Sequence, residues 1–139
     1  MQNPYWQYQE QRVQHASAGE RVILLYDGAI RFLHGARAAM EEENAPGQRY
    51  YLDRAQSVLL ALLSSLNLQQ GGELAICLLR VYEYCYNRLC DAVSCDDLSA
   101  VVEVCGLLTD LRGAWADAAA QLAAPAVAEP EAAPLALTA

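Results

Sequence analysis

The sequence predicts an all-α fold, arranged as an antiparallel up-down four-helix bundle. No alternating run of β-branched residues flanked by hairpin turns occurs, so the usual signals of β-strands are missing. Apolar residues instead recur at intervals of three and four in four successive segments, which is the spacing of one helix face. The segments have similar lengths and are joined by short turns, which favours antiparallel packing of neighbours.

The first helix is expected from Ser17 to residue 43. Ser17 and Glu20 have the spacing of a capping box, in which the glutamate returns to the backbone amide of the serine. Residues 44–47 (Asn-Ala-Pro-Gly) are predicted to end this helix. Its apolar face holds Val22, Tyr26, Ala29, Leu33, Ala36 and Met40.

Three further helices follow the same reasoning. The second is expected over residues 48–68 and the third over residues 73–93, with the turn Gln-Gln-Gly-Gly between them. The fourth is predicted to be capped by Ser94 or Asp96 and to run to residue 122. Trp115 lies on its apolar face and is expected in the core.

The two ends of the chain differ from this pattern. Residues 1–16 contain Pro4, several aromatic residues and scattered glutamines, so they are expected to form an extension or a short helix outside the bundle. Residues 124–139 are rich in alanine and proline, which predicts a disordered tail. The bundle itself is therefore expected over residues 17–123.

Composition excludes several classes of function. The net charge is −8, which disfavours binding to nucleic-acid phosphates. No segment approaches the roughly 20 apolar residues needed to span a bilayer, so membrane insertion is not expected. The start of the chain lacks the basic and apolar regions of a signal peptide, which predicts a cytoplasmic protein.

Catalysis is not predicted either. A bundle that binds metal ions uses Glu-x-x-His motifs, but Arg31 stands where His34 would need its glutamate, and His15 falls in the flank. No phosphate-binding loop or nucleophile motif is visible, so neither an enzyme nor a cofactor is expected. The cysteines are interpreted as small buried thiols without a metal or redox role, and they are Cys77, Cys85, Cys90, Cys95 and Cys105.

The third helix carries more apolar surface than one bundle needs. On a helical wheel its large apolar residues fill an arc of roughly 220°, whereas a bundle helix needs an apolar stripe somewhat over 100° wide. Two explanations fit this width. Either the helix is simply the most buried of the four or pairs in a structural homodimer, or it offers a groove to an amphipathic segment of another protein.

Several motifs resemble the flagellar export chaperones of the FliS family. They are NPYWQY (residues 3–8), ASAGERVILLYDGAIRFL (16–33), GGELAICLLRVYEY (71–84) and LLTDLRGAWADA (107–118). The resemblance implies a helical bundle that binds the disordered C-terminal segment of flagellin in apolar grooves. It also implies that the chaperone prevents early polymerisation and delivers flagellin to the export gate of the flagellar type III secretion apparatus. The chain itself is expected to be a monomer or a weak homodimer.

The resemblance also assigns roles to residues near the start of the chain. Tyr5 and Tyr8 match the N-terminal aromatics of the family, which implies that they belong to a mobile segment covering part of the bundle. For Tyr5 the resemblance also implies docking to the export gate. The alternative for both residues is a simple hydrophobic staple onto the bundle. Tyr26, Asp27 and Arg31 match the signature of the first helix, which implies a part in flagellin binding. For Asp27 two roles stay open, namely contact with the N-terminal segment or the cargo, and an ion pair with Arg31.

The remaining assignments concern the turn and the groove. Gly71 and Gly72 are expected to allow a positive φ, and Glu73 to place a charge at a helix N-terminus. The residues expected to line the flagellin groove are Leu59 and Leu63 on the second helix and Leu78, Tyr82 and Tyr86 on the third.

Overall fold

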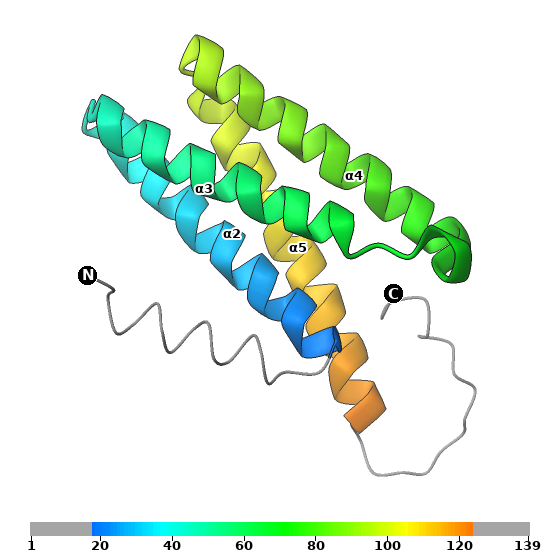
Figure 1. The fold of residues 1–139 in the computed structure, drawn as a ribbon. Helices are drawn as coiled ribbons and strands as arrows, with labels where there is room; N and C mark the ends of the chain where they lie inside the picture. The colour runs from blue at the N-terminus through cyan, green and yellow to red at the C-terminus, as the bar shows by residue number, and fades with distance from the viewer. Residues whose placement is uncertain (1–17, 124–139) are drawn as a thin grey trace, which may run out of the picture.

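The computed structural model describes residues 18–123, which form four α-helices and the turns between them (Figure 1). The helices are α2 (Ala18–Glu41), α3 (Ala45–Ser64), α4 (Leu68–Cys95) and α5 (Leu98–Ala123). Within residues 18–123 there is no strand, which confirms the all-α prediction. The capping serine Ser17, the N-terminal aromatics Tyr5 and Tyr8, and the alanine- and proline-rich tail lie outside the described residues.

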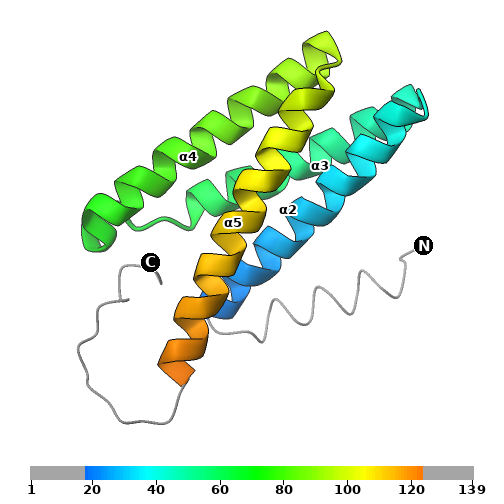
Figure 2. The same ribbon diagram turned by 180° about the vertical axis from the view of Figure 1, so that it is seen from behind.

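Successive helices run in alternating directions, as predicted for an up-down bundle (Figure 1). Helix α2 packs against α3 and α5, and α4 packs against the same two helices. The view from behind shows α5 crossing the other helices obliquely (Figure 2). Helices α2 and α4 are therefore diagonal partners, and a contact between them has to pass through the centre of the bundle.

The turn between α2 and α3 both ends one helix and begins the next. The amide of Asn44 donates to the carbonyl of Ala39 at 2.8 Å, and the amide of Glu43 donates to the carbonyl of Met40 at 3.1 Å. This is the Schellman arrangement, with Glu43 at φ +57° in the position that glycine usually takes. The Asn44 side chain then caps α3 by accepting from the amide of Gly47. Helix α3 thus begins at Ala45, three residues before the predicted start.

The turn between α3 and α4 differs more from the prediction. Helix α3 ends at Ser64 rather than near residue 68, and Asn67 caps a first turn of α4 that begins at Leu68. The chain then bends at Gly72, whose φ of +57° and ψ of −138° suit glycine alone. The predicted positive φ is confirmed at Gly72, and Glu73 follows it at the start of the straight part of α4.

The turn between α4 and α5 corrects the predicted helix cap. Ser94 lies inside α4, and Asp96 ends that helix in the left-handed conformation with φ +56°. Asp97 performs the capping instead, because its Oδ1 accepts from the amides of Ser99 at 3.0 Å and Ala100 at 3.3 Å. The hydrogen bond from the Ser99 hydroxyl is the main reason why the pKa of Asp97 is lowered.

The core is an aliphatic layer with two tyrosines and a tryptophan near its middle. Trp115 is buried there, as predicted. No buried nitrogen or oxygen atom of a side chain lacks a hydrogen-bond partner among the described residues. The fully buried aliphatic side chains include Leu33, Leu52, Leu59, Leu62, Leu89, Val101, Val104 and Leu108.

Close packing of α2 on α3 gives a first prediction. A Cβ added to Gly35 would lie 2.7 Å from the ring of Tyr51, so the ring would have to move. We expect Gly35→Ala to lower the free energy of unfolding by about 1–3 kcal/mol, as overpacking does. Urea denaturation followed by circular dichroism measures this change.

The matched control is Gly106→Ala in α5, where no atom lies within 4 Å of the new Cβ. The free energy of unfolding of this control should rise by about 0.5–1 kcal/mol, because alanine loses less conformational entropy than glycine when a helix folds. A Gly35→Ala protein as stable as the control would contradict the close packing of α2 and α3.

Candidate functional site

A hydrogen-bonded cluster of three aromatic side chains occupies the centre of the bundle. The hydroxyls of Tyr26 in α2 and Tyr82 in α4 lie 2.5 Å apart, so the two diagonal helices are joined directly. The indole Nε1 of Trp115 in α5 donates to the Tyr26 hydroxyl at 3.1 Å. Both tyrosines are almost wholly buried, and their polar atoms are satisfied by one another rather than by water.

Burial widens the pH range over which this centre is uncharged. Loss of solvation raises the pKa of Tyr26 and, for the same main reason, that of Tyr82. The neighbouring Cys85 is buried too, and loss of solvation raises the pKa of its thiol to about 11. All three groups therefore stay protonated at neutral pH, and the cluster is a neutral structural element.

The structure places four of the expected flagellin-binding residues in the core. Tyr26, Leu59 and Tyr82 have at most 1% of their surface exposed, and Leu78 has 6%. Their side chains point into the core and do not line an open groove. The physical reason is the position of α4 between α3 and α5, because the stripe that contains Leu78 and Tyr82 faces the centre of the bundle.

Two expected groove residues lie closer to the surface. Leu63 and Tyr86 are half-buried at the edge of the core. The seam between α3 and α4 passes beside them, because the Gln56 amide of α3 lies 3.5 Å from the Tyr86 carbonyl and 3.3 Å from the Cys90 sulfur. Leu60 lies on the same side of α3 as Gln56, and 49% of its surface is exposed.

The exposed large apolar side chains gather on two helices. Among the described residues, α3 carries Tyr50 and Leu60, and α4 carries Leu68, Leu74, Ile76, Tyr84 and Val93. Helix α5 contributes Val102, and α2 contributes none. We call the outward surface of the neighbouring helices α3 and α4 around Leu60 and Ile76 the α3–α4 face (Figure 1). Tyr84 is outside this face because its hydroxyl bonds to α5, and Val93 is outside it because it lies in a pocket at the end of the bundle. The surplus apolar surface expected for the third helix is therefore present, but on other residues than those predicted.

Asp27 lies on the opposite side of the bundle and has a partner that sequence spacing did not indicate. Arg112 of α5 approaches it with Nε at 2.8 Å and one terminal nitrogen at 3.4 Å. The carboxylate of Asp27 raises the pKa of Arg112 through this hydrogen bond. The pair joins α2 to α5 and is partly exposed, whereas Arg31 lies on the exposed surface of α2.

A second polar cluster fixes α4 to α5. The Nε of Arg88 lies 2.8 Å from Glu103, and its terminal nitrogen contacts Asp91 at 3.1 Å and Asp97 at 3.4 Å. The hydroxyl of Tyr84 donates to Glu103, and this bond is the main reason why the pKa of Glu103 is lowered. Sequence analysis did not find this cluster, although the acidic residues around the turn are visible in the sequence.

The cysteines are only partly as expected. Cys85 is buried and Cys105 is half-buried, but Cys77, Cys90 and Cys95 are exposed. The prediction that all of them are buried thiols is therefore wrong for three positions. No group of three or more potential metal ligands occurs within residues 18–123, and none of the described helices is apolar enough over its length to cross a membrane.

The sequence model of one protein family, described as flagellar protein FliS, matches residues 1–122. The chain belongs to the FliS family. This agrees with the resemblance carried by the helix and turn motifs of the sequence. The match includes the described helices almost to the end of α5.

Similar proteins support the same family. A flagellar secretion chaperone FliS of Bacillus subtilis (strain 168) is 35% identical over 118 residues, which cover 85% of this chain and 87% of that protein. A flagellar secretion chaperone FliSB of Pseudomonas aeruginosa is 35% identical over 106 residues, or 76% of this chain and 84% of that protein. A flagellar secretion chaperone FliS of Salmonella typhimurium is 33% identical over 107 residues, which cover 76% of this chain and 79% of that protein.

The aromatic cluster gives a second prediction. Tyr26→Phe removes the hydroxyl that meets both Tyr82 and Trp115, so both buried partners lose a hydrogen bond. We expect this to lower the free energy of unfolding by about 1–3 kcal/mol. Chemical denaturation followed by tryptophan fluorescence measures the change.

Tyr82→Phe is the matched comparison. It removes the hydrogen bond between the two tyrosines but keeps the one between Tyr26 and Trp115. The free energy of unfolding should therefore fall less than in Tyr26→Phe. A Tyr82→Phe protein that is less stable than Tyr26→Phe would show that the Tyr26 hydroxyl is not the centre of the cluster.

Proposed function

We propose that this chain is a non-enzymatic flagellar export chaperone that acts in the cytoplasm. It binds the disordered C-terminal segment of flagellin, keeps it from polymerising early and delivers it to the flagellar type III export apparatus. Membership of the FliS family and the names of its relatives, which are secretion chaperones, support the general role. The finer statement about flagellin and its delivery rests on the family resemblance and on the surface described next.

The observation that carries this proposal is the gathering of exposed apolar side chains on α3 and α4. A monomer seldom exposes apolar residues in one region without a partner, and an amphipathic cargo helix buries such residues by laying its apolar face against them. Leu60 on α3 and Ile76 on α4 are exposed aliphatic side chains, with 49% and 41% of their surface exposed. Leu63 and Tyr86 at the seam extend the contact inward.

The buried residues act indirectly in this proposal. Tyr26, Leu59, Leu78 and Tyr82 hold α3 and α4 in position, so the cargo meets a surface that is already formed. A preformed surface loses little entropy when it binds, and the disordered cargo bears most of the ordering cost. Asp27 is held by Arg112 and belongs to the frame that supports this surface.

A third prediction tests the α3–α4 face directly. Leu60→Asp and Ile76→Asp place a charge where an apolar cargo side chain would pack. We expect each change to weaken binding of a flagellin C-terminal peptide by about tenfold or more, as for a contact worth over 1 kcal/mol. Fluorescence anisotropy with a labelled peptide gives the affinity, and circular dichroism checks the fold.

Val102→Asp on α5 is the matched control. Val102 has 42% of its surface exposed, close to the 41% of Ile76, but it lies outside the α3–α4 face. Its peptide affinity should stay within about twofold of the unchanged protein, as expected for a contact outside the interface. Equal losses in all three variants would argue against a specific face.

The alternative is a structural homodimer in which two α3–α4 faces cover each other. Size-exclusion chromatography with and without the flagellin peptide separates the two functions. A monomer that forms a complex with the peptide supports the chaperone. A stable dimer that ignores the peptide would replace the proposal.

A fourth prediction concerns the N-terminal segment, which we propose as a mobile cover that carries Tyr5 and Tyr8. Removal of residues 1–12 should leave the helical signal of circular dichroism unchanged, because the four helices of the bundle begin at residue 18. It should change the affinity for the flagellin peptide. A truncated protein that is unfolded would make this segment part of the core instead.

A further inference from the structure

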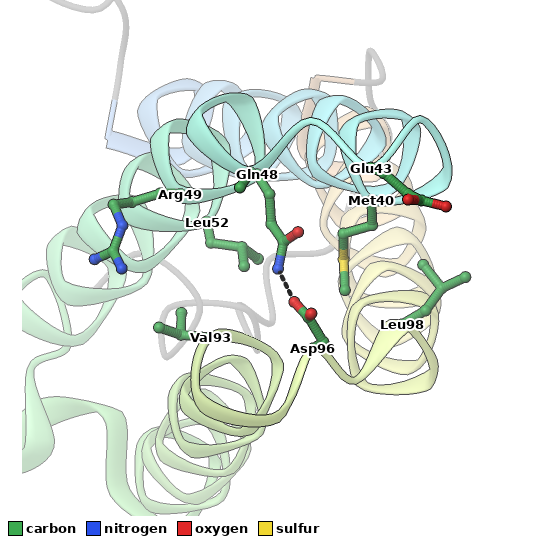
Figure 3. A pocket seen from close by; sticks show the side chains of 9 residues that line it. Met40, Glu43, Gln48, Arg49, Leu52, Val93, Asp96 and Leu98 are labelled. Atoms are coloured by element: carbon green, nitrogen blue, oxygen red, sulfur yellow. Dashed lines mark hydrogen bonds between the residues drawn. The ribbon is translucent and has the colours of Figure 1, made fainter.

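A second surface lies at the end of the bundle where α2 meets α3 and α4 meets α5. A pocket of about 510 Å³ opens there between the two turns (Figure 3). It is separate from the exposed positions Leu60 and Ile76 at which the cargo prediction is tested. Its lining residues are Met40, Glu43, Ala45, Gln48, Arg49, Leu52, Val93, Asp96 and Leu98.

The lining of this pocket combines an apolar part with polar side chains. Leu52 is buried, Met40 and Leu98 are half-buried, and Val93 has 42% of its surface exposed. The Gln48 amide donates to Asp96 at 2.5 Å and joins the two pairs of helices across the pocket (Figure 3). The pocket therefore has a preformed shape, with room for an apolar side chain of a partner beside this bond.

The charges around the pocket are predominantly negative. Glu43 and Asp96 line it from the two turns. Glu41 and Glu42 directly precede Glu43 in the chain, and Asp91 and Asp97 are close to Asp96 in the sequence. Arg37 pairs with Glu41, and Arg88 pairs with Asp91 and Asp97. Among the described residues no ion pair involves Glu42, Glu43 or Asp96. Arg49 is the basic residue of the lining, and it lies on the opposite side from Glu43 (Figure 3).

We propose that this pocket is a docking site for a basic segment of a partner protein. One aliphatic side chain of that segment enters the pocket, and flanking lysine or arginine side chains lie against Glu42 and Glu43. An apolar anchor inside a polar rim is the usual form of a compact binding site. The opposite charges of the two surfaces speed the encounter and select the partner.

The same charges disfavour other occupants. A second copy of this chain carries a net charge of −8 and would bring further carboxylates to the rim. Nucleic acid would be repelled for the same reason. The proposal does not depend on the cargo of the α3–α4 face, because it uses different residues and a different part of the bundle.

Synthetic peptides added to the full-length, isotope-labelled chain test the proposal. The first probe is acetyl-Gly-Lys-Leu-Arg-Lys-Gly-amide. A second probe replaces leucine by serine, and a third replaces the basic residues by glutamate. Two-dimensional amide NMR titration gives both the affinity and the residues that are affected.

We expect the leucine probe to shift the amides of residues 40–49 and 93–98. The serine probe should bind at least about fivefold more weakly, because it lacks the apolar anchor. The acidic probe should not bind. No shifts at millimolar peptide, shifts elsewhere on the chain, or equal binding of the leucine and serine probes would each overturn the proposal.

Matched variants separate the rim from the pocket. The double variant Glu42→Gln and Glu43→Gln should lower the affinity for the leucine probe by about threefold to tenfold, because two surface charge contacts are lost. The control double variant Glu73→Gln and Glu83→Gln changes the net charge equally on the exposed side of α4 and should have no effect. If both double variants lowered the affinity equally, the probe would be held by general charge attraction, and the proposal of a specific site would be wrong.

A filling variant completes the test. Ala45→Phe places a ring in the pocket, whereas Ala61→Phe adds the same ring at an exposed position of α3 outside it. Ala45→Phe should abolish binding of the leucine probe, and Ala61→Phe should leave it unchanged. Unchanged binding by a folded Ala45→Phe protein would contradict the proposed anchor.

Discussion

The hydroxyl of Tyr26 holds the bundle together at the point where three helices meet. Helices α2 and α4 are diagonal and otherwise touch through their neighbours, so the bond between Tyr26 and Tyr82 fixes a distance that apolar packing alone leaves adjustable. The indole of Trp115 adds α5 to the same contact. A buried polar cluster with all its groups satisfied specifies one arrangement of the helices, because any other arrangement leaves a donor or acceptor without a partner.

This constraint decides which surface remains for partners. With Tyr82 held at the centre, the stripe of α4 that contains Leu78 and Tyr82 is used by the core, and exposed apolar residues of that helix such as Ile76 lie outside the stripe. They adjoin the exposed residues of α3 to form the α3–α4 face. The structural role of the aromatic cluster and the proposed binding role of the α3–α4 face are therefore two consequences of one helix orientation.

The sequence predicted the helices, the core position of Trp115 and the glycine bend, because these depend on local spacing and backbone preference. It also predicted the surplus of apolar surface on the third helix. It assigned that surplus to Leu78 and Tyr82, because a helical wheel gives the width of an apolar arc and not the sector that faces the neighbours. The partner of Asp27 was missed for a related reason. Arg112 is 85 residues away, and sequence spacing offers only local partners such as Arg31.

Hydrogen–deuterium exchange of the full chain, with and without the flagellin C-terminal segment, tests most directly whether the α3–α4 face binds the cargo. We expect bound cargo to slow amide exchange over residues 57–64 and 74–86, which contain Leu60 and Ile76 of the α3–α4 face. The ends of the bundle around Glu43 and Asp96 should keep their exchange rates. Protection confined to α2 and α5, or no protection at saturating cargo, would contradict the account.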